Sequence, residues 1–332
     1  MFKIAVDAMG GDHAPKSIVE GVNMAVKQFS NIEIVLVGDE SKITPYLESN
    51  ERITIVHTTE KVESDDEPVS AVRRKKQSSM VLAAQMVKDN EADVLLSAGN
   101  TGALLASGLL VIGRIKGVDR PGLMPILPTM NEKAPQFILM DAGANADCKP
   151  KNLHQFAILA NFYAKAVLGV SQPRVGLINN GTEASKGNEL AKASYALLNE
   201  EPSIHFIGNV EAKELLQGVC DIAVTDGFTG NAILKSLEGT AKTLFSAIKH
   251  KLLFSGIKGK LGALLIKDAL LSLRDQYDDS KQGGAILLGV NAPVIKAHGS
   301  SNEEAIFHAI RQAKNIMEAK VVDQLVEYFA NN

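Results

Sequence analysis

The chain has 332 residues, of which 45% are hydrophobic, so it is long enough to bury a large core in one or two α/β domains. A net charge of −3, 5% aromatic residues and the absence of tryptophan argue against a nucleic-acid-binding surface. Its two cysteines, Cys148 and Cys220, form no CxxC motif and no signal peptide is recognised, so we expect a cytoplasmic protein without disulfides or structural zinc.

Short apolar runs alternate with helical patterns from the first residues onward. The sequence predicts strands over 2–6, 34–37, 53–56, 93–96, 123–127, 137–140, 175–178, 204–207, 222–224 and 294–296. Helices are expected between them, for example over 15–29, 153–168 and 189–198. This alternation favours a three-layer αβα fold with a mostly parallel open sheet.

One glycine-rich turn stands out between a predicted strand and a predicted helix. Ser97 to Gly102 follow the strand over 93–96, and an uncharged apolar run continues from there to Gly113. Its glycines allow a ligand to approach the backbone, and the following helix offers unpaired N–H groups, which suit an anion. An ordinary tight turn is the alternative. A membrane span over 94–113 is disfavoured, because Asn100, Thr101 and four glycines interrupt the run.

Most other predicted strands also end in Asp, Asn, Gly, Thr or Ser. We expect the carboxyl ends of these strands to share one edge of the sheet and to form one polar crevice for a small anion, most simply phosphate. The candidate substrate-binding residues along this crevice are Asn100, Thr101, Gly102, Asp141, Asn145, Asn180, Thr229 and Asn231.

Several common catalytic signatures are missing from the chain. There is no GxxxxGK[ST], GxGxxG, GxSxG or HExxH motif, and the seven histidines show no metal-ligand spacing. We therefore expect no metal and no cofactor. Transfer of a group to or from a phosphate held by backbone N–H groups and cations needs no nucleophile from the protein.

Six segments together resemble the bacterial phosphate acyltransferase family of phospholipid synthesis (PlsX). They are DAMGGDHAP (7–15), EPVSAVRRKK (67–76), SAGNTGA (97–103), DAGANADCKP (141–150), INNGTEASKGN (178–188) and DGFTGNAILK (226–235). The resemblance implies one large α/β unit over 1–332, similar in fold to phosphate acetyltransferases and isopropylmalate dehydrogenases. It also implies a homodimer that converts acyl-[acyl carrier protein] and orthophosphate into acyl phosphate and free carrier. The product would feed a membrane acyl-phosphate:glycerol-3-phosphate acyltransferase.

The resemblance also suggests roles for charged residues. Arg120, in a Gly-Val-x-Arg segment, matches the phosphate-binding arginine of phosphate acetyltransferases, and Lys186 is a second charge partner for phosphate. His13 is a candidate to protonate the leaving thiolate, or it caps its own loop. Asp141 and Asp226 are expected to orient a lysine or arginine, with N-capping of the next helix as the alternative. Lys186, His13 and Asp226 are thus the predicted catalytic residues.

Residues 239–275 are predicted to form a protruding amphipathic helical hairpin. Six lysines and no acidic residue occur between 239 and 267, and the expected tip contains Leu253, Phe254, Ile257, Lys258, Lys260 and Leu261. Such a tip suits an anionic membrane surface at the inner face of the cell membrane, or the acidic acyl carrier protein. A dimer interface with solvated lysines is the alternative.

Two other functions remain open at this point. A NAD-dependent dehydrogenase of the related fold would need an adenine-ribose pocket and a metal-binding carboxylate set, and neither is evident in the sequence. A non-catalytic lipid or membrane adaptor would explain the basic hairpin but not the glycine-rich strand ends.

Overall fold

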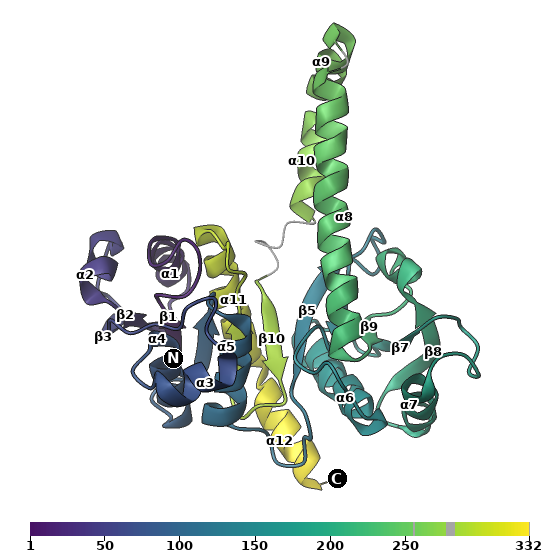
Figure 1. Ribbon diagram of the computed structural model, residues 1–332, viewed down its shortest axis with the longest axis horizontal. Helices are drawn as coiled ribbons and strands as arrows, with labels where there is room; N and C mark the ends of the chain where they lie inside the picture. The colour runs from purple at the N-terminus through teal and green to yellow at the C-terminus, as the bar shows by residue number, and fades with distance from the viewer. Residues whose placement is uncertain (255, 277–282, 332) are drawn as a thin grey trace.

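The computed structural model describes residues 1–254, 256–276 and 283–331, and it shows two lobes joined by one sheet, with a long helical arm (Figure 1). Eleven strands form this sheet in the order β3-β2-β1-β4-β11-β10-β5-β6-β9-β7-β8. Their bounds are β1 Phe2–Asp7, β2 Ile32–Gly38, β3 Ile53–His57, β4 Val94–Ser97, β5 Gly122–Pro128, β6 Gln136–Met140, β7 Arg174–Asn179, β8 His205–Glu211, β9 Ile222–Val224, β10 Ala285–Leu288 and β11 Val294–Lys296.

The strands run in opposite directions in the two lobes. β1, β2, β3, β4 and β11 are parallel to one another, β10 is antiparallel to both β11 and β5, and β6 is antiparallel to β5. β6, β9, β7 and β8 are again mutually parallel. The expectation that all carboxyl ends share one edge is therefore wrong, because three successive antiparallel pairs, β11–β10, β10–β5 and β5–β6, turn the second lobe around. The strand β10 was not expected.

Helices cover both faces of the sheet. Their bounds are α1 Lys16–Gln28, α2 Glu40–Ile43, α3 Pro68–Arg74, α4 Ser79–Lys88, α5 Thr101–Ser107, α6 Pro150–Ala166, α7 Glu189–Glu200, α8 Gly227–Phe254, α9 Gly256–Leu265, α10 Lys267–Gln276, α11 Glu303–Ala319 and α12 Val321–Asn331, with 3₁₀ turns over Thr44–Tyr46 and Ala212–Gln217 and a π-helical turn over Gly108–Ile112.

The two faces of the sheet are covered differently. On one face, a single core cluster runs through both lobes and joins α1 and α11 to α6 and α7, with Ile18, Ile306 and Phe156 among its buried side chains. On the other face, two separate clusters lie under α4 and α5 in the first lobe and under α8 in the second. The central strands β5 and β10 are therefore left between α5 and α8, where a ligand can reach them.

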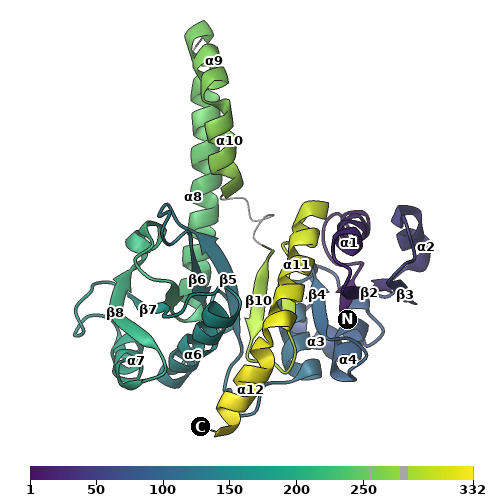
Figure 2. The ribbon, with the colours of Figure 1, turned by 180° about the vertical axis from the view of Figure 1, so that it is seen from behind.

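A long arm rises from the second lobe (Figures 1 and 2). α8 begins in the body at Gly227 and runs outward for 28 residues, and α9 and α10 return beside it. α8 ends at Phe254 and α9 begins at Gly256, and Ser255 between them lies outside the described residues. Within the described part of the chain, none of the helices combines the length and apolar character needed to cross a bilayer.

Candidate active site between the two lobes

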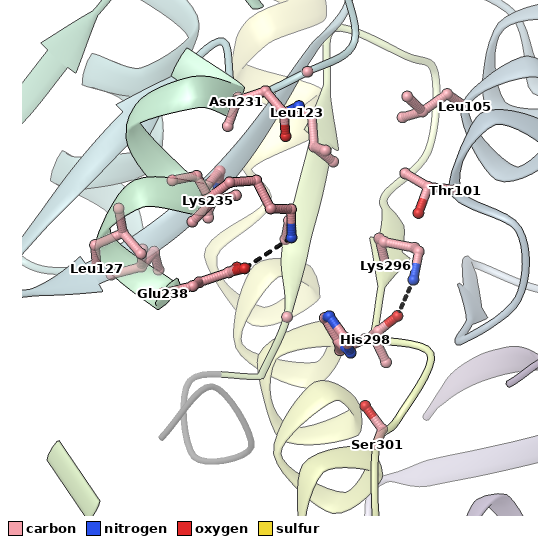
Figure 3. A pocket seen from close by; sticks show the side chains of 18 of the residues that line it. Thr101, Leu105, Leu123, Leu127, Asn231, Lys235, Glu238, Lys296, His298 and Ser301 are labelled. Carbon is pink, nitrogen blue, oxygen red and sulfur yellow. Dashed lines mark hydrogen bonds and ion pairs between the residues drawn. The ribbon is translucent and has the colours of Figure 1, made fainter. Parts of the chain in front are cut away.

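A crevice of about 430 Å³ lies between α5 and α8, over β5 and the neighbouring ends of β10 and β11 (Figure 3). Its floor is apolar, and its two walls carry polar and charged groups from both lobes. The lining residues that matter below are Thr101, Gly102, Leu105, Leu123, Leu127, Asn231, Lys235, Glu238, Lys296, His298 and Ser301. The arrangement provides a hydrophobic surface and cations in one cavity.

Two lysines face this crevice from opposite walls. Lys235 extends from α8 and pairs with Glu238, with 2.8 Å between Nζ and Oε2. Lys296 ends β11, is 9% exposed, and donates a hydrogen bond from Nζ to the carbonyl of Ala297. Figure 3 shows Lys296 on the same wall as Thr101 and His298. Neither lysine was predicted from the sequence, although Lys235 ends the segment DGFTGNAILK.

The first-lobe wall begins at the glycine-rich turn. Asn100 is the N-cap of α5: its Oδ1 accepts from the amide of Ala103 at 3.0 Å, while its Nδ2 donates to carbonyls of the acidic loop at 63–66. Thr101 and Gly102 line the crevice directly. A Cβ on Gly102 would come within 2.5 Å of Pro68 Cγ, so this glycine lets α3 pack against α5. Asn100 therefore shapes the turn, and Thr101 is the side chain of this turn that lines the crevice.

The second-lobe wall begins where α8 starts. Asp226 caps this helix, since its Oδ1 accepts from the amide of Thr229 and its Oδ2 from the Thr229 hydroxyl, both at 2.8 Å. A Cβ on Gly230 would lie 1.9 Å from the carbonyl of Asp141, so only glycine allows the first turn of α8 to approach so closely. Asn231, one residue further, lines the crevice.

Asp141 is fully buried beneath this turn. Its carboxylate accepts five hydrogen bonds, from the amides of Leu123, Gly143, Ala144 and Asn145 and from the Asn145 side chain, at 2.7 to 3.1 Å. Asn145 Nδ2 also donates to the carbonyl of Pro121. Among the described residues, no lysine or arginine contacts Asp141, so the expectation that it orients a cation is not met. Asp141 and Asn145 instead hold the loop after β6.

A second cavity, of about 410 Å³, opens at the carboxyl ends of β7 and β9. Asn180, Asp226 and Thr229 line it together with Asn179 and Asn188. The polar residues that the sequence assigned to one crevice are therefore separated. Thr101, Gly102 and Asn231 line the first cavity, Asn180 and Thr229 line the second, and Asn100, Asp141 and Asn145 are in neither lining.

Besides the buried Asp141, three exposed charged or titratable residues of the predicted site line neither cavity. His13 is exposed in the loop before α1, and its carbonyl accepts from the amide and hydroxyl of Ser17. Arg120 is exposed just before β5, and Lys186 is exposed in the loop between β7 and α7. Their roles toward substrate stay predictions.

The described residues form neither a metal-binding site nor a disulfide. No group of three or more His, Cys, Asp or Glu is arranged to hold a metal ion there. Both cysteines are free thiols, and burial raises the pKa of Cys148 to about 11 and that of Cys220 to about 12. Neither thiol is therefore prepared to act as a thiolate nucleophile.

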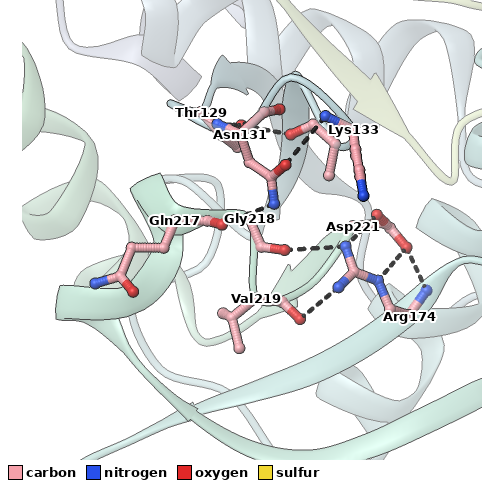
Figure 4. Close-up of polar contacts among 9 residues, drawn as sticks. Thr129, Asn131, Lys133, Arg174, Gln217, Gly218, Val219 and Asp221 are labelled. Carbon is pink, nitrogen blue, oxygen red and sulfur yellow. Dashed lines mark hydrogen bonds and ion pairs between the residues drawn. The ribbon is translucent and has the colours of Figure 1, made fainter.

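In the second lobe, an ion pair between Arg174 and Asp221 holds the start of β7 (Figure 4). Arg174 Nη2 lies 2.9 Å from Asp221 Oδ1, and the guanidinium also donates to the carbonyls of Gly218 and Val219 at 3.0 Å. These contacts join the start of β7 to the loop that leads into β9, and so fix the strands that carry the second cavity.

Apolar side chains at the far end of the arm are open to solvent. Phe254 and Leu265 are each 77% exposed, and Leu261 and Leu264 are also exposed. The side chains of Leu253, Ile257, Lys258 and Lys260, which belong to the predicted tip, lie outside the described residues. The described part of the tip is thus an unburied apolar surface beside exposed lysines.

Residues 2–324 match the family described as "Fatty acid synthesis protein". A phosphate acyltransferase of Streptococcus uberis is 58% identical over 330 residues, covering 99% of this chain and 98% of that relative. One from Streptococcus agalactiae is 57% identical over 331 residues and both full lengths. These matches cover the whole region that carries the lobes, the crevice and the arm.

Solved structures support the fold at lower identity. A phosphotransacetylase from Streptococcus pyogenes superposes with a TM-score of 0.63 at 16% identity, covering 97% of this chain and 94% of the other. A 4-hydroxythreonine-4-phosphate dehydrogenase from Klebsiella pneumoniae has a TM-score of 0.52 at 12% identity, covering 95% and 99%. Both a transacylase and a dehydrogenase thus share this architecture, and the close relatives decide between them: the chain belongs to the phosphate acyltransferase family of fatty acid and phospholipid synthesis.

Proposed function

We propose that the crevice between the lobes transfers an acyl group from acyl-[acyl carrier protein] to orthophosphate. The observation that carries this proposal is the combination of an apolar floor, which includes Leu123 and Leu127, with Lys235 and Lys296 on the walls. An acyl chain needs the first, and a phosphate dianion and a departing thiolate need the second. The names of the close relatives agree with this reaction.

A thioester is already activated, so the protein mainly has to position phosphate against its carbonyl carbon and exclude water. In the proposed arrangement Lys235, Thr101 and Asn231 hold phosphate, since they face the cavity from both walls. The acyl chain lies along β5. Asp226 and Thr229 support α8, and no covalent acyl-enzyme is required.

The direct test supplies purified protein with acyl-[acyl carrier protein] and phosphate and traps acyl phosphate with hydroxylamine. We expect hydroxamate that depends on both substrates. Leu127→Glu, which puts a charge on the floor, should lower turnover of long-chain donors at least about tenfold. Absence of acyl phosphate with every acyl donor, or hydride transfer with NAD, would overturn the proposal.

We also propose that the exposed end of the arm docks on an anionic membrane surface at the inner face of the cell membrane. Phe254 and Leu265 would enter the lipid headgroup region while the lysines of 239–267 meet its negative charge. Such docking would keep a hydrolysable acyl phosphate near the membrane glycerol-3-phosphate acyltransferase that consumes it. The acyl carrier protein and a second copy of the chain are the remaining predicted partners.

Vesicles containing phosphatidylglycerol test the docking. Leu264→Glu with Leu265→Glu should reduce sedimentation with the vesicles at least tenfold, and high salt should weaken binding of the parent protein. Leu244→Glu is the matched control: Leu244 is 57% exposed but lies on α8 roughly 15 Å from the end of that helix. Unchanged sedimentation of the double variant would contradict membrane docking. Dissociation into monomers would assign the tip to a dimer interface instead.

A further inference from the structure

Lys296 differs from every other lysine described in the crevice or near it. It stands at the end of a core strand, 9% exposed, whereas Lys235 on the opposite wall has a side chain that is 56% exposed and paired with Glu238. An ammonium has three N–H donors, and the one protein acceptor described for Lys296 is the carbonyl of Ala297. The remaining donors are available to groups that enter the cavity.

Burial, more than nearby charge, makes this ammonium easy to deprotonate. Burial, followed by repulsion from Lys235, lowers the pKa of Lys296 to about 8, against the attraction of Asp12 and Asp7. Glu238 forms its ion pair with Lys235. His298 lies just after β11, on the same wall of the crevice as Lys296. A simple alkyl thiol such as that of cysteine has a pKa of about 8.5, so the pKa of the Lys296 ammonium would closely match that of a departing alkyl thiol.

We propose that Lys296 donates the proton that the carrier thiolate needs in order to leave. The inference rests on the proposed acyl transfer. A phosphate oxygen forms a bond to the thioester carbonyl carbon, the C–S bond breaks, and the sulfur takes a proton from Lys296 Nζ. The neutral amine then recovers a proton from the phosphate hydroxyl. The sum is thioester plus HPO₄²⁻ giving acyl phosphate dianion plus thiol.

The leaving group tests this role directly, because an aryl thiolate is a weak base that departs without protonation. Lys296→Met keeps an unbranched side chain, one atom shorter, and removes the donor. With acyl-[acyl carrier protein], kcat should fall about 10²-fold or more. With an aryl thioester of the same acyl chain, the variant should stay within about threefold of the parent. Lys235→Met is the matched control and should raise the KM for phosphate with both donors alike.

A second measurement is the pH dependence of kcat, beginning with the parent protein. In the parent protein, kcat with the carrier thioester should decline as pH rises through about 8, where Lys296 loses its proton, whereas kcat with the aryl thioester should not. Lys296→Arg, whose guanidinium stays protonated, should abolish this decline. Equal losses with both donors, or a rise in phosphate KM alone, would show that Lys296 is not the proton donor. The proposed function itself would fail differently, by yielding no acyl phosphate from the parent protein.

Discussion

Each lobe places one buried aspartate at a strand end beside the crevice, and the two are held in different ways. Asp7, at the end of β1, accepts from the hydroxyls of Ser79 and Ser97 at 2.6 and 2.7 Å and from the amide of Met9. Asp141 follows β6 and accepts mostly from amides of its own loop and of β5. Burial raises the pKa of both carboxyl groups, against these hydrogen bonds.

The difference shows what each acid organises. Asp7 joins three separate elements, because Ser79 begins α4 and Ser97 ends β4. Asp141 instead fixes one loop, against which the first turn of α8 packs through Gly230. The first-lobe wall is therefore held by several side chains, and Ser79 and Ser97 can each be substituted separately. The second-lobe wall is held by the carboxylate of Asp141 alone.

The largest effect is expected from Asp141→Ala. The substitution leaves four amides without their acceptor, two of them in buried and two in partly buried hydrogen bonds, which should lower the free energy of unfolding by about 3 kcal/mol or more. Asp226→Ala is the matched control, since this partly buried cap should cost about 1 kcal/mol. Urea denaturation measures both. Equal losses in the two variants would remove the special role given to Asp141.

A smaller effect is expected in the first lobe. Ser97→Ala removes one hydroxyl from Asp7 and should cost about 1 to 2 kcal/mol, since the carboxylate keeps Ser79. The double variant with Ser79→Ala should cost more than the sum of the two single variants, because they share one acceptor. Strict additivity, measured by thermal or urea unfolding, would contradict a shared network.

The smallest effect concerns Arg174 and Asp221, away from both aspartates. Burial alone would raise the pKa of Asp221, but the hydrogen bonds from Arg174 hold this pKa below its usual value. This pair therefore contributes stability above the unfolded-state pKa of about 3.9, and the contribution is lost as pH falls below that value. Arg174→Met should lower stability at pH 7 by about 1 kcal/mol and lessen the loss of stability in acid. If Arg174→Met lost as much stability in acid as the parent protein does, the assignment would be contradicted.

Much of the architecture was predictable because strand and helix patterns are local. The ten predicted strands correspond to observed ones, and the six segments identified the family. The strand β10 was missed, since Ala285–Leu288 is a short apolar run with no pattern of its own. β10 is antiparallel to both neighbours and so leaves β5 parallel to β11, and the antiparallel pair β5–β6 is what turns the second lobe around. The strand patterns did not show that pairing, and the predicted site was therefore placed along one edge of the sheet.

The candidate site was predicted only in part, for the same reason. Thr101, Gly102 and Asn231 line the crevice, as their positions at helix starts suggested. Asn100 and Asp141 use their polar atoms on the backbone, and a sequence cannot distinguish a cap from a ligand contact. Lys296 was overlooked because it ends a strand in the usual core pattern, and only the sheet order shows that it faces the other lobe.

The strand order also constrains how the chain is made. The edge of β4 is covered by β11, and β11 and β10 lie within residues 285–296, after the entire second lobe and the arm. During synthesis, the edge of β4 in the first lobe therefore stays open until residues 285–296 have been made. An unpaired strand edge can join another chain. The nascent protein consequently has an interval in which this edge is open to other chains, and the interval ends only when residues 285–296 return to complete the lobe that was started first.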